Sequence, residues 1–224
     1  MSSTAVALTT KDDKVPAHIK IDAGRGNENV GNNIAIPRIK LLQKMSDEVD
    51  PGHPKHVEGA QIGHFFNSLT NKTYGNELYV ISITFTLEYV VWRKREKGGG
   101  LFGNFKTLED AQAALTASEN NPNDYDITDT HSHLLLIKDP ETGELEDTPV
   151  IMDFNSSKMR VSRSWNSQIR LKGGDRFAAL WKLSSVNVTT STGNAYQNVD
   201  VSCVGWTQKE DFAIAESIYE SHAS

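Results

Sequence analysis

The clearest regular pattern along the chain is an alternation of apolar and polar residues between Leu78 and Trp92. Apolar or aromatic side chains stand at the odd positions from 81 to 91, and hydroxyl or carboxylate side chains stand at 82, 84, 86 and 88. A period of two predicts a long β-strand with one buried face and one polar face. Trp92 continues the polar series, so we expect its ring to be exposed to solvent.

Further strands are predicted on both sides of this segment. Apolar residues between Ile34 and Leu42 predict a first strand that bends at Pro37. Turn residues between short apolar runs predict two later hairpins, which pair 134–137 with 150–154 and 180–188 with 196–206.

Three helices are also predicted. Thr107 to Asp110 form a capping box at the start of a short helix, and a polar, acidic loop is expected to continue to Thr130. A second helix should extend from about Asn155 to Leu171. A closing helix should start at Thr207, with these apolar residues facing inward: Phe212, Ala215, Ile218 and Tyr219.

This order of elements favours a mainly β protein of the α+β class. Several strands, one helix and a final strand pair are compatible with a five-stranded OB-type barrel that carries an additional hairpin and a C-terminal helix. The helix would then lie between the third and fourth barrel strands. A generic α+β sandwich predicts the same order, so the pattern leaves both architectures open.

The second predicted helix has two different faces. At 100° per residue, Val161, Trp165 and Ile169 share one side, which we expect to be core. Arginines occupy nearly the opposite side, at positions 160, 163 and 170. No acidic residue lies four positions from them, so they repel one another unless an anion lies across them. A solvated charged face is the alternative interpretation.

Charge is sorted along the chain, although the 224 residues carry a formal net charge of −6. The segment from Lys158 to Lys182 contains seven Lys or Arg residues against one acid, whereas 109–147 contains eleven acids and one base. A second basic run follows Trp92. Cations interleaved with aromatic rings are typical of single-strand nucleic-acid grooves. The candidate contact residues are Trp92, Arg93, Lys94, Arg95, Lys97, Phe102, Phe105, Lys158, Arg160, Arg163, Arg170, Lys172 and Arg176.

The glycine-rich stretch after this basic run has two interpretations. Its backbone N–H groups could approach a phosphate closely while Phe102 and Phe105 bind a ligand, or the two rings could fold back onto the protein. Gly98 to Gly103 also matches G-x-G-x-x-G. A dinucleotide site requires those glycines to join a strand directly to a helix, and the predicted helix begins only after Thr107.

Catalytic and metal-binding patterns are weak. His131 and His133 have no Cys-x-x-Cys or His-Glu-x-x-His motif beside them, so we interpret them as ordinary histidines. The single cysteine, Cys203, lies in an apolar strand and is expected to be buried and unreactive. We therefore predict no enzyme and no cofactor. The chain has no sustained apolar run and no signal-peptide pattern, so we expect it in the cytoplasm.

Several segments resemble a family of tailed-bacteriophage proteins, some of which are similar to phage single-stranded DNA-binding proteins with an OB fold. The resemblance rests on Ile36-Pro-Arg-Ile-Lys-Leu-Leu-Gln43, Phe66-Asn-Ser-Leu-Thr70 with Tyr74-Gly75, Tyr89-Val-Val-Trp-Arg93 before Gly98-Gly-Gly100, and Ser156-Ser-Lys158 with Ser162-Arg-Ser-Trp-Asn-Ser167. It implies a replication or recombination protein that coats single strands in the infected host cell and works with phage replication proteins. The expected contacts are 92–97 and the basic side of the second helix. Many proteins with this function end in an acidic tail, whereas this sequence ends in an amphipathic helix.

We accordingly predict a flexible N-terminal arm (1–33), an OB-like nucleic-acid-binding domain (34–206) and a C-terminal amphipathic helix (207–224). The predicted function is non-enzymatic, sequence-tolerant binding of single-stranded DNA. The alternatives are a phage structural or host-interaction protein without a nucleic-acid role, and a nuclease or strand-annealing enzyme. The sequence leaves the oligomeric state and the choice between DNA and RNA open.

Overall fold

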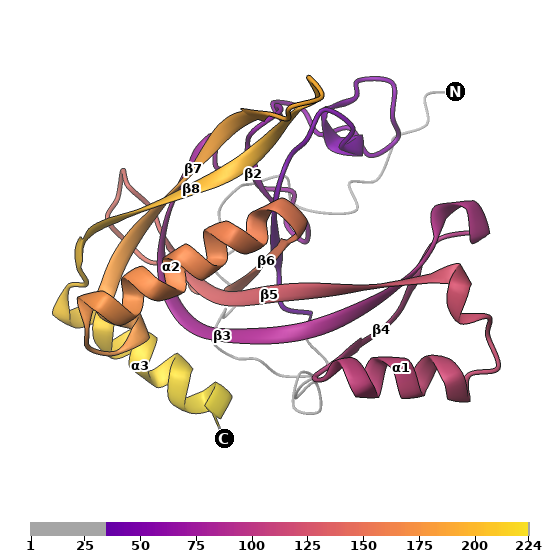
Figure 1. Ribbon diagram of the computed structural model, residues 1–224. Coiled ribbons are helices and arrows are strands. Elements are labelled where there is room, and N and C mark those ends of the chain that lie inside the picture. Colours follow the sequence, from indigo (N-terminus) through magenta and orange to yellow (C-terminus); the bar gives the residue numbers. More distant parts are fainter. Residues whose placement is uncertain (1–34, 224) are drawn as a thin grey trace, which may run out of the picture. The chain divides into compact units, whose positions relative to one another are not determined.

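The computed structural model describes residues 35–223 of the chain. In this part of the chain, eight strands form one mixed sheet accompanied by three α-helices (Figure 1). The strands are β1 (Arg38–Leu41), β2 (Phe65–Asn67), β3 (Glu77–Arg93), β4 (Leu101–Phe105), β5 (Tyr125–Lys138), β6 (Val150–Asn155), β7 (Ala179–Thr189) and β8 (Ala195–Trp206). The α-helices are α1 (Leu108–Ala117), α2 (Met159–Lys172) and α3 (Lys209–Ala223), and single 3-10 turns are η2 (Asp47–Val49), η3 (Arg95–Lys97), η4 (Pro122–Asp124), η5 (Ser156–Lys158) and η6 (Arg176–Ala178).

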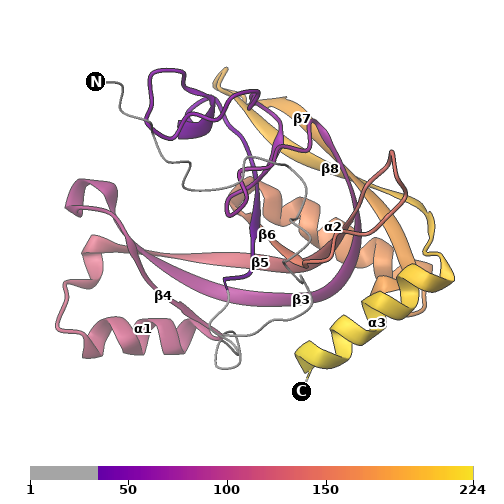
Figure 2. The ribbon, with the colours of Figure 1, turned by 180° about the vertical axis from the view of Figure 1, so that it is seen from behind.

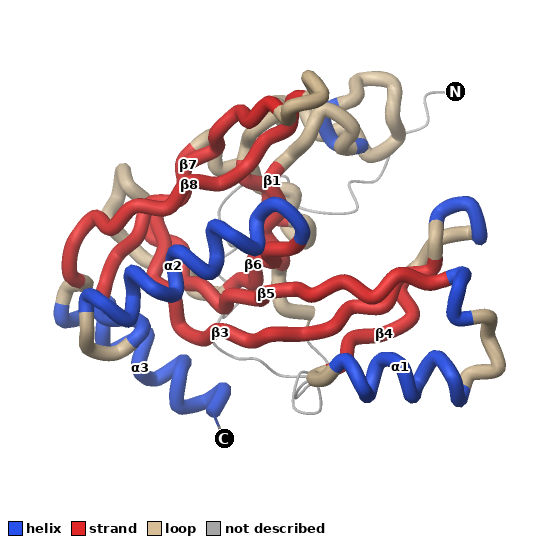
Figure 3. The backbone as a smooth tube through the Cα atoms, in the orientation of Figure 1, coloured by secondary structure: helices blue, strands red, loops and turns tan. Residues whose placement is uncertain are grey.

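The long strand β3 organises the sheet. It pairs with β5 from Tyr79 to Arg93, and its first and last parts also pair with β7 and β4 on its other edge. The strand order is β2-β1-β6-β5-β3-β7-β8, and every pairing is antiparallel except β1 with β6. Figure 3 shows β3 and β5 side by side over most of their length.

A large core fills the space between the sheet and α2. The Trp165 ring is fully buried in it, 6.1 Å from the Trp181 ring and tilted against Phe154. Ile169 and Val161 pack on the same side of α2, which confirms the core face predicted for this helix. The helix lies in front of β5 and β6 in Figure 1 and behind the sheet in Figure 2.

Strand β3 packs on both of its faces. Leu78 and Val80 face the α2 core, whereas Ile81 and Ile83 point to the other side. The single buried face predicted for this strand is therefore wrong, because the register with β5 shifts between Ser82 and Thr84 and the alternation changes face there. Ile81 and Ile83 join a second cluster, to which α3 contributes Ala215. The closing helix predicted from the sequence is therefore packed against the sheet.

A third, small core lies at the far end of β3 and β5, under α1. The Thr107 hydroxyl accepts a hydrogen bond from the Asp110 amide at 3.1 Å, as the predicted capping box requires. The cluster is built on three buried residues, Val91, Ala111 and Leu115. It packs the outer half of the β3–β5 pair against α1, and no residue of α2 belongs to it.

Sequence patterns located most of these elements. The long strand, the basic helix, the final strand pair and the closing helix are confirmed, and the first strand begins at Arg38, directly after Pro37. The acidic loop predicted up to Thr130 is wrong over its last six residues, because β5 already begins at Tyr125. The predicted N-terminal arm at 1–33 lies outside the described residues.

Candidate nucleic-acid interface

Trp92 lies at the outer end of β3 and is 45% exposed, which confirms the exposure predicted for its ring. Its pairing with β4 is shifted by a bulge, which places it opposite Leu101, itself 57% exposed. On its other edge β3 pairs with β5, where Trp92 lies opposite Asp126 and Val90 lies opposite Thr128. Two apolar side chains thus meet at the surface of a strand end that is otherwise polar.

The turn after Trp92 carries the predicted cations. Lys94 and Lys97 lie 3.8 Å and 3.2 Å from the carboxylates of Asp126 and Asp124. Arg93 and Arg95 are exposed and have no carboxylate within ion-pair distance among residues 35–223. Two guanidinium groups beside an exposed indole are therefore available to an anion from outside.

The three glycines of this turn have a backbone role. Gly98, Gly99 and Gly100 adopt φ values of +104°, +66° and +111°, where side chains are strained. The turn therefore needs glycine to return the chain into β4, whether or not a phosphate approaches it.

Phe102 and Phe105 fold back onto the protein, one of the two alternatives left open by the sequence. Both rings are half-buried in the small core under α1, and the Phe102 ring contacts Tyr125 edge-on at 5.3 Å. Their packing explains why two phenylalanines are tolerated beside an exposed turn. We leave both out of the interface.

The basic stripe of α2 is exposed as the helical pattern predicts. Arg160, Arg163 and Arg170 have no acidic partner within the described part of the chain. Lys172 differs, because its Nζ lies 3.8 Å above the Trp206 ring. Lys158, just before the helix, is partly buried, and this desolvation lowers its pKa. The usable cations of α2 are thus the three arginines.

Arg176 is a structural residue, not a surface cation. Its guanidinium donates to Ser82 Oγ at 2.8 Å, to Asn166 Oδ1 at 2.7 Å and to His133 Nδ1 at 2.9 Å. Burial lowers its pKa to about 10. Because these donors are satisfied inside the protein, we also leave Arg176 out of the interface.

A buried hydrogen-bond chain under α2 was not predicted from the sequence. Arg176 can only donate, so His133 must accept at Nδ1 and carry its proton on Nε2. That proton is donated to Ser162 Oγ at 2.7 Å, and the Ser162 hydroxyl is left to donate to His131 Nδ1 at 2.8 Å. The His133 ring also stacks on Trp165 at 4.5 Å. Together these contacts tie α2 to the sheet.

The two histidines are neutral structural groups. Burial, followed by the charge of Arg176, lowers the pKa of His133 to about 2, and burial also lowers the pKa of His131. Residues 35–223 contain no group of three or more His, Cys, Asp or Glu side chains placed to hold a metal. The expected burial of Cys203 is wrong: its side chain is exposed on the outer strand β8, just past a bulge in the β7–β8 pairing.

The structure does not bring the two basic regions onto one face of the sheet. His131 and His133, which contact α2, alternate along β5 with Thr130 and Thr128. Thr130 and Thr128 therefore point to the face opposite α2. Their partners on β3 are Glu88 and Val90, and Trp92 is the next residue of β3 that points to that same face. The α2 arginines and Trp92 therefore form two separate candidate surfaces.

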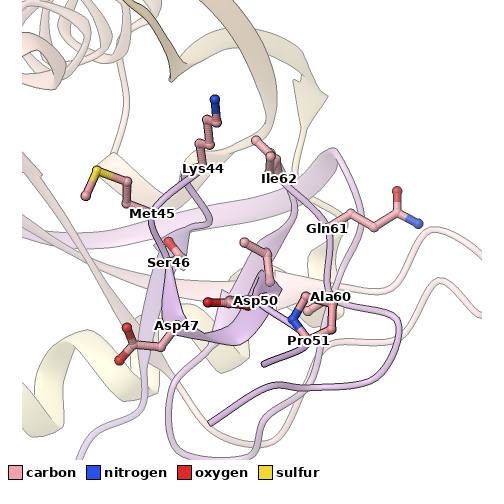
Figure 4. Close-up of a pocket in the computed structure, with 10 residues that line it drawn as sticks. Lys44, Met45, Ser46, Asp47, Asp50, Pro51, Ala60, Gln61 and Ile62 are labelled. Carbon is pink, nitrogen blue, oxygen red and sulfur yellow. The ribbon is translucent and has the colours of Figure 1, made fainter. Parts of the chain in front are cut away.

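A pocket with a volume of about 830 Å³ lies elsewhere (Figure 4). It is formed by the segments 44–51 and 60–62, and none of the predicted contact residues lines it. Asp47 is already paired there with Lys55, at 3.6 Å. Lys44 and Asp50, two side chains of opposite charge, also line the pocket, so its lining has no excess of one sign that would select a charged ligand.

The fold and these surfaces define a mainly β protein of the α+β class with a curled mixed sheet and two exposed basic regions. The model of the Pam3 phage gp34-like protein family matches residues 8–224, so the chain belongs to this phage protein family. Comparisons with curated proteins and with solved structures gave no match. No helix between residues 35 and 223 is both long and apolar enough to cross a membrane.

Proposed function

We propose that this phage protein binds single-stranded DNA without sequence specificity and without catalysis, in phage DNA replication or recombination. One observation carries the proposal: Trp92 is 45% exposed and is followed by two arginines, Arg93 and Arg95, that have no carboxylate partner among the described residues. An exposed indole offers a face on which any base can stack, and adjacent guanidinium groups neutralise phosphates.

The connectivity of the sheet supports an OB-type barrel as the framework for this function. Strands β3, β5 and β6 form an antiparallel meander, α2 follows, and β7 and β8 complete the set by pairing β7 with β3. Three strands, a helix and two strands make up the order expected of an OB fold. In this chain β1 and β2 extend the sheet beyond β6.

The arginine stripe of α2 supplies a second, purely electrostatic contact in this proposal. Arg160, Arg163 and Arg170 project from the exposed side of the helix, and no aromatic residue on that side accompanies them. Such a surface neutralises phosphates but cannot stack bases. A bound strand that contacts both surfaces has to pass around the edge of the sheet.

Fluorescence anisotropy with a labelled oligo-dT and a matched duplex tests the proposal. We expect tighter binding to the single strand, and an affinity that falls steeply with salt, by about 0.7 in the log–log slope for each phosphate neutralised. Equal affinity for the duplex, or no salt response, would contradict it. Incubation of the same oligomer with Mg²⁺ or Mn²⁺ tests the nuclease alternative, and we expect no cleavage.

A role in contacts with phage or host proteins is the second candidate, and one surface favours it. Leu171, Val204 and Trp206 are 86%, 52% and 62% exposed at the adjoining ends of α2 and β8. Exposed apolar side chains of this size are costly in water and are typical of protein contacts. Two results together would favour this function. The wild type would not bind the oligomer, and Trp206→Ala would no longer bind a protein partner that the wild type binds.

A further inference from the structure

A small pocket beside Trp92 has the chemistry of a base-binding site. Its volume is about 170 Å³, and it lies on the outer half of the sheet, where β1, β6, β5, β3 and β4 each contribute to its lining. The pocket is open to the face that carries Trp92, not to the face covered by α2. The following argument rests on the proposed function, because it concerns the same strand and the same tryptophan.

One side of the pocket is apolar. Trp92 and Leu101, which face each other across the β3–β4 pair, line it together with Val90, which is only 7% exposed. An aromatic side chain beside two aliphatic ones can cover a face of one planar ring. Such surroundings suit a nucleobase better than a sugar or a phosphate.

The charge in the pocket excludes phosphate as its ligand. Glu88 and Asp153 contribute two carboxylates, and Arg38 contributes one cation, which is already paired with Asp153. A net negative lining repels a phosphate and accepts hydrogen bonds from N–H groups. The phosphates next to a base held here would instead lie near Arg93 and Arg95.

Two asparagines complete the polar part of the lining. The Asn104 amide donates to Glu88 Oε2 at 3.3 Å, which leaves its own carbonyl oxygen as an acceptor facing the same region. The Asn155 side chain makes no hydrogen bond within the described residues and does not cap the turn that follows it. Glu88 Oε1 and the carbonyl oxygens of Asn104 and Asn155 therefore remain as acceptors for an N–H group of a ligand, and the Asn155 NH2 group remains as a donor.

We propose that this pocket holds one unstacked base of the bound strand and prefers the amino-bearing bases cytosine and adenine over thymine. The exocyclic amino group of cytosine or adenine donates to a carboxylate or amide oxygen. Thymine presents a carbonyl oxygen at that position and would face carboxylates. The pocket thus adds a modest base preference to binding that is otherwise sequence-tolerant.

The test compares oligo-dC with oligo-dT of equal length, two flexible pyrimidine strands, in the wild type and in Glu88→Gln, Asn155→Ala and a control, Asn187→Ala. Asn187 is an exposed asparagine on β7 that does not line the pocket. We expect the wild type and the control to bind dC about five-fold more tightly than dT. In the two pocket variants the ratio should fall to about one, with melting temperatures close to that of the wild type.

Failure of the pocket and failure of the proposed function give different results. If dC and dT bind equally to the wild type, or if the ratio is unchanged in Asn155→Ala and Glu88→Gln, the base pocket is wrong and the single-strand function stands. If no oligomer binds the wild type, both are wrong. An oligomer of abasic sugar-phosphate residues should bind more weakly than either pyrimidine strand. Equal binding of the abasic strand would contradict both the pocket and the stacking of bases on Trp92.

Discussion

The side-chain amide of Gln43 forms two hydrogen bonds with the backbone of Gln197, as a neighbouring strand would. Its Nε2 donates to the Gln197 carbonyl at 3.0 Å, and its Oε1 accepts from the Gln197 N–H at 2.9 Å. Gln43 follows β1, and Gln197 lies in β8, the outermost strand on the other side of the sheet. One side chain thus links two strands that share no ladder within the described residues.

A neighbouring glycine keeps these two regions close. Gly63 has φ of +87°, and a Cβ atom there would lie 2.9 Å from Ser185 Oγ and 3.4 Å from Gln197 Oε1. Gly63 also pairs with Leu42 through a backbone hydrogen bond of 2.9 Å. The loop before β2 therefore packs against β7 and β8 only because this residue has no side chain.

Gln43→Ala should lower the free energy of unfolding by about 1–2 kcal/mol, because it leaves a partly buried N–H and carbonyl of Gln197 without partners. Urea denaturation measures this loss, and Gln61→Ala is the control, since Gln61 is exposed and its side chain makes no hydrogen bond among the described residues. Equal stability of the two variants would show that the link contributes nothing.

The buried His133 should make stability depend on pH. Its pKa is 6.5 in the unfolded chain and about 2 in the fold. Below pH 6.5 the unfolded chain therefore binds a proton that the folded protein does not, so the free energy of unfolding falls as pH falls. Above pH 6.5 both states are neutral and this effect is absent. Between pH 7 and pH 5 the loss should be about 2 kcal/mol from this residue.

His131, whose pKa is also lowered, adds to the loss in the same direction. Chemical denaturation at pH 7, 6 and 5 measures the slope. His133→Gln should be less stable at pH 7 but should lose less stability on going to pH 5. A variant with the same slope as the wild type would contradict the assignment of His133 as a neutral buried group.

Sequence periodicity predicted the elements that have a regular apolar pattern. The alternation in β3 predicted the strand but not its buried side, because Leu78 and Val80 join the α2 core whereas Ile81 and Ile83 pack on the other face. The spacing of Val161, Trp165 and Ile169 determines the core side of α2, so this prediction could be made from residue types alone. The start of β5 could not, because Asp126 and Asp129 have the composition of a loop. Pairing with β3 and packing of Ile127 near α1 stabilise it as a strand.

The candidate site was predictable only in part. Exposure of Trp92 and of the α2 arginines followed from local patterns, whereas the partners of Arg176 lie 10 to 94 residues away and leave no local signal. The hydrogen bonds from His131 and His133 to Ser162 could not be predicted for the same reason, because 31 and 29 residues separate the partners in the sequence. The exposure of Cys203 and the bulge beside it in the β7–β8 pairing depend on tertiary structure as well.

Replacing Arg160, Arg163 and Arg170 together with Ala should weaken oligo-dT binding and reduce its salt slope by up to about 2, because each phosphate that is no longer neutralised removes about 0.7 from the slope. The melting temperature should stay near the wild-type value, because the stripe faces away from the core. Trp165→Ala on the opposite side of the helix should instead cost about 3–5 kcal/mol of stability. If Trp165→Ala were stable but failed to bind the oligomer, the assignment of the core face and the binding face of α2 would be wrong.

Arg176→Met should destabilise the fold rather than the complex. It leaves Ser82, His133 and Asn166 without their shared donor, at a cost of about 1–3 kcal/mol. Oligomer affinity, measured where the variant is fully folded, should remain within about two-fold of the wild type. If the variant lost oligomer binding while its stability was unchanged, Arg176 would have to be counted among the residues that contact the oligomer.

The most direct test of single-strand binding compares two exposed tryptophans. Trp92 and Trp206 are 45% and 62% exposed, so replacement of either by Ala should leave the melting temperature nearly unchanged. In an anisotropy titration with oligo-dT, we expect Trp92→Ala to bind about ten-fold more weakly, as loss of one base–aromatic stack requires. Trp206→Ala should bind like the wild type. Equal affinity of Trp92→Ala and wild type, both folded, would contradict the account.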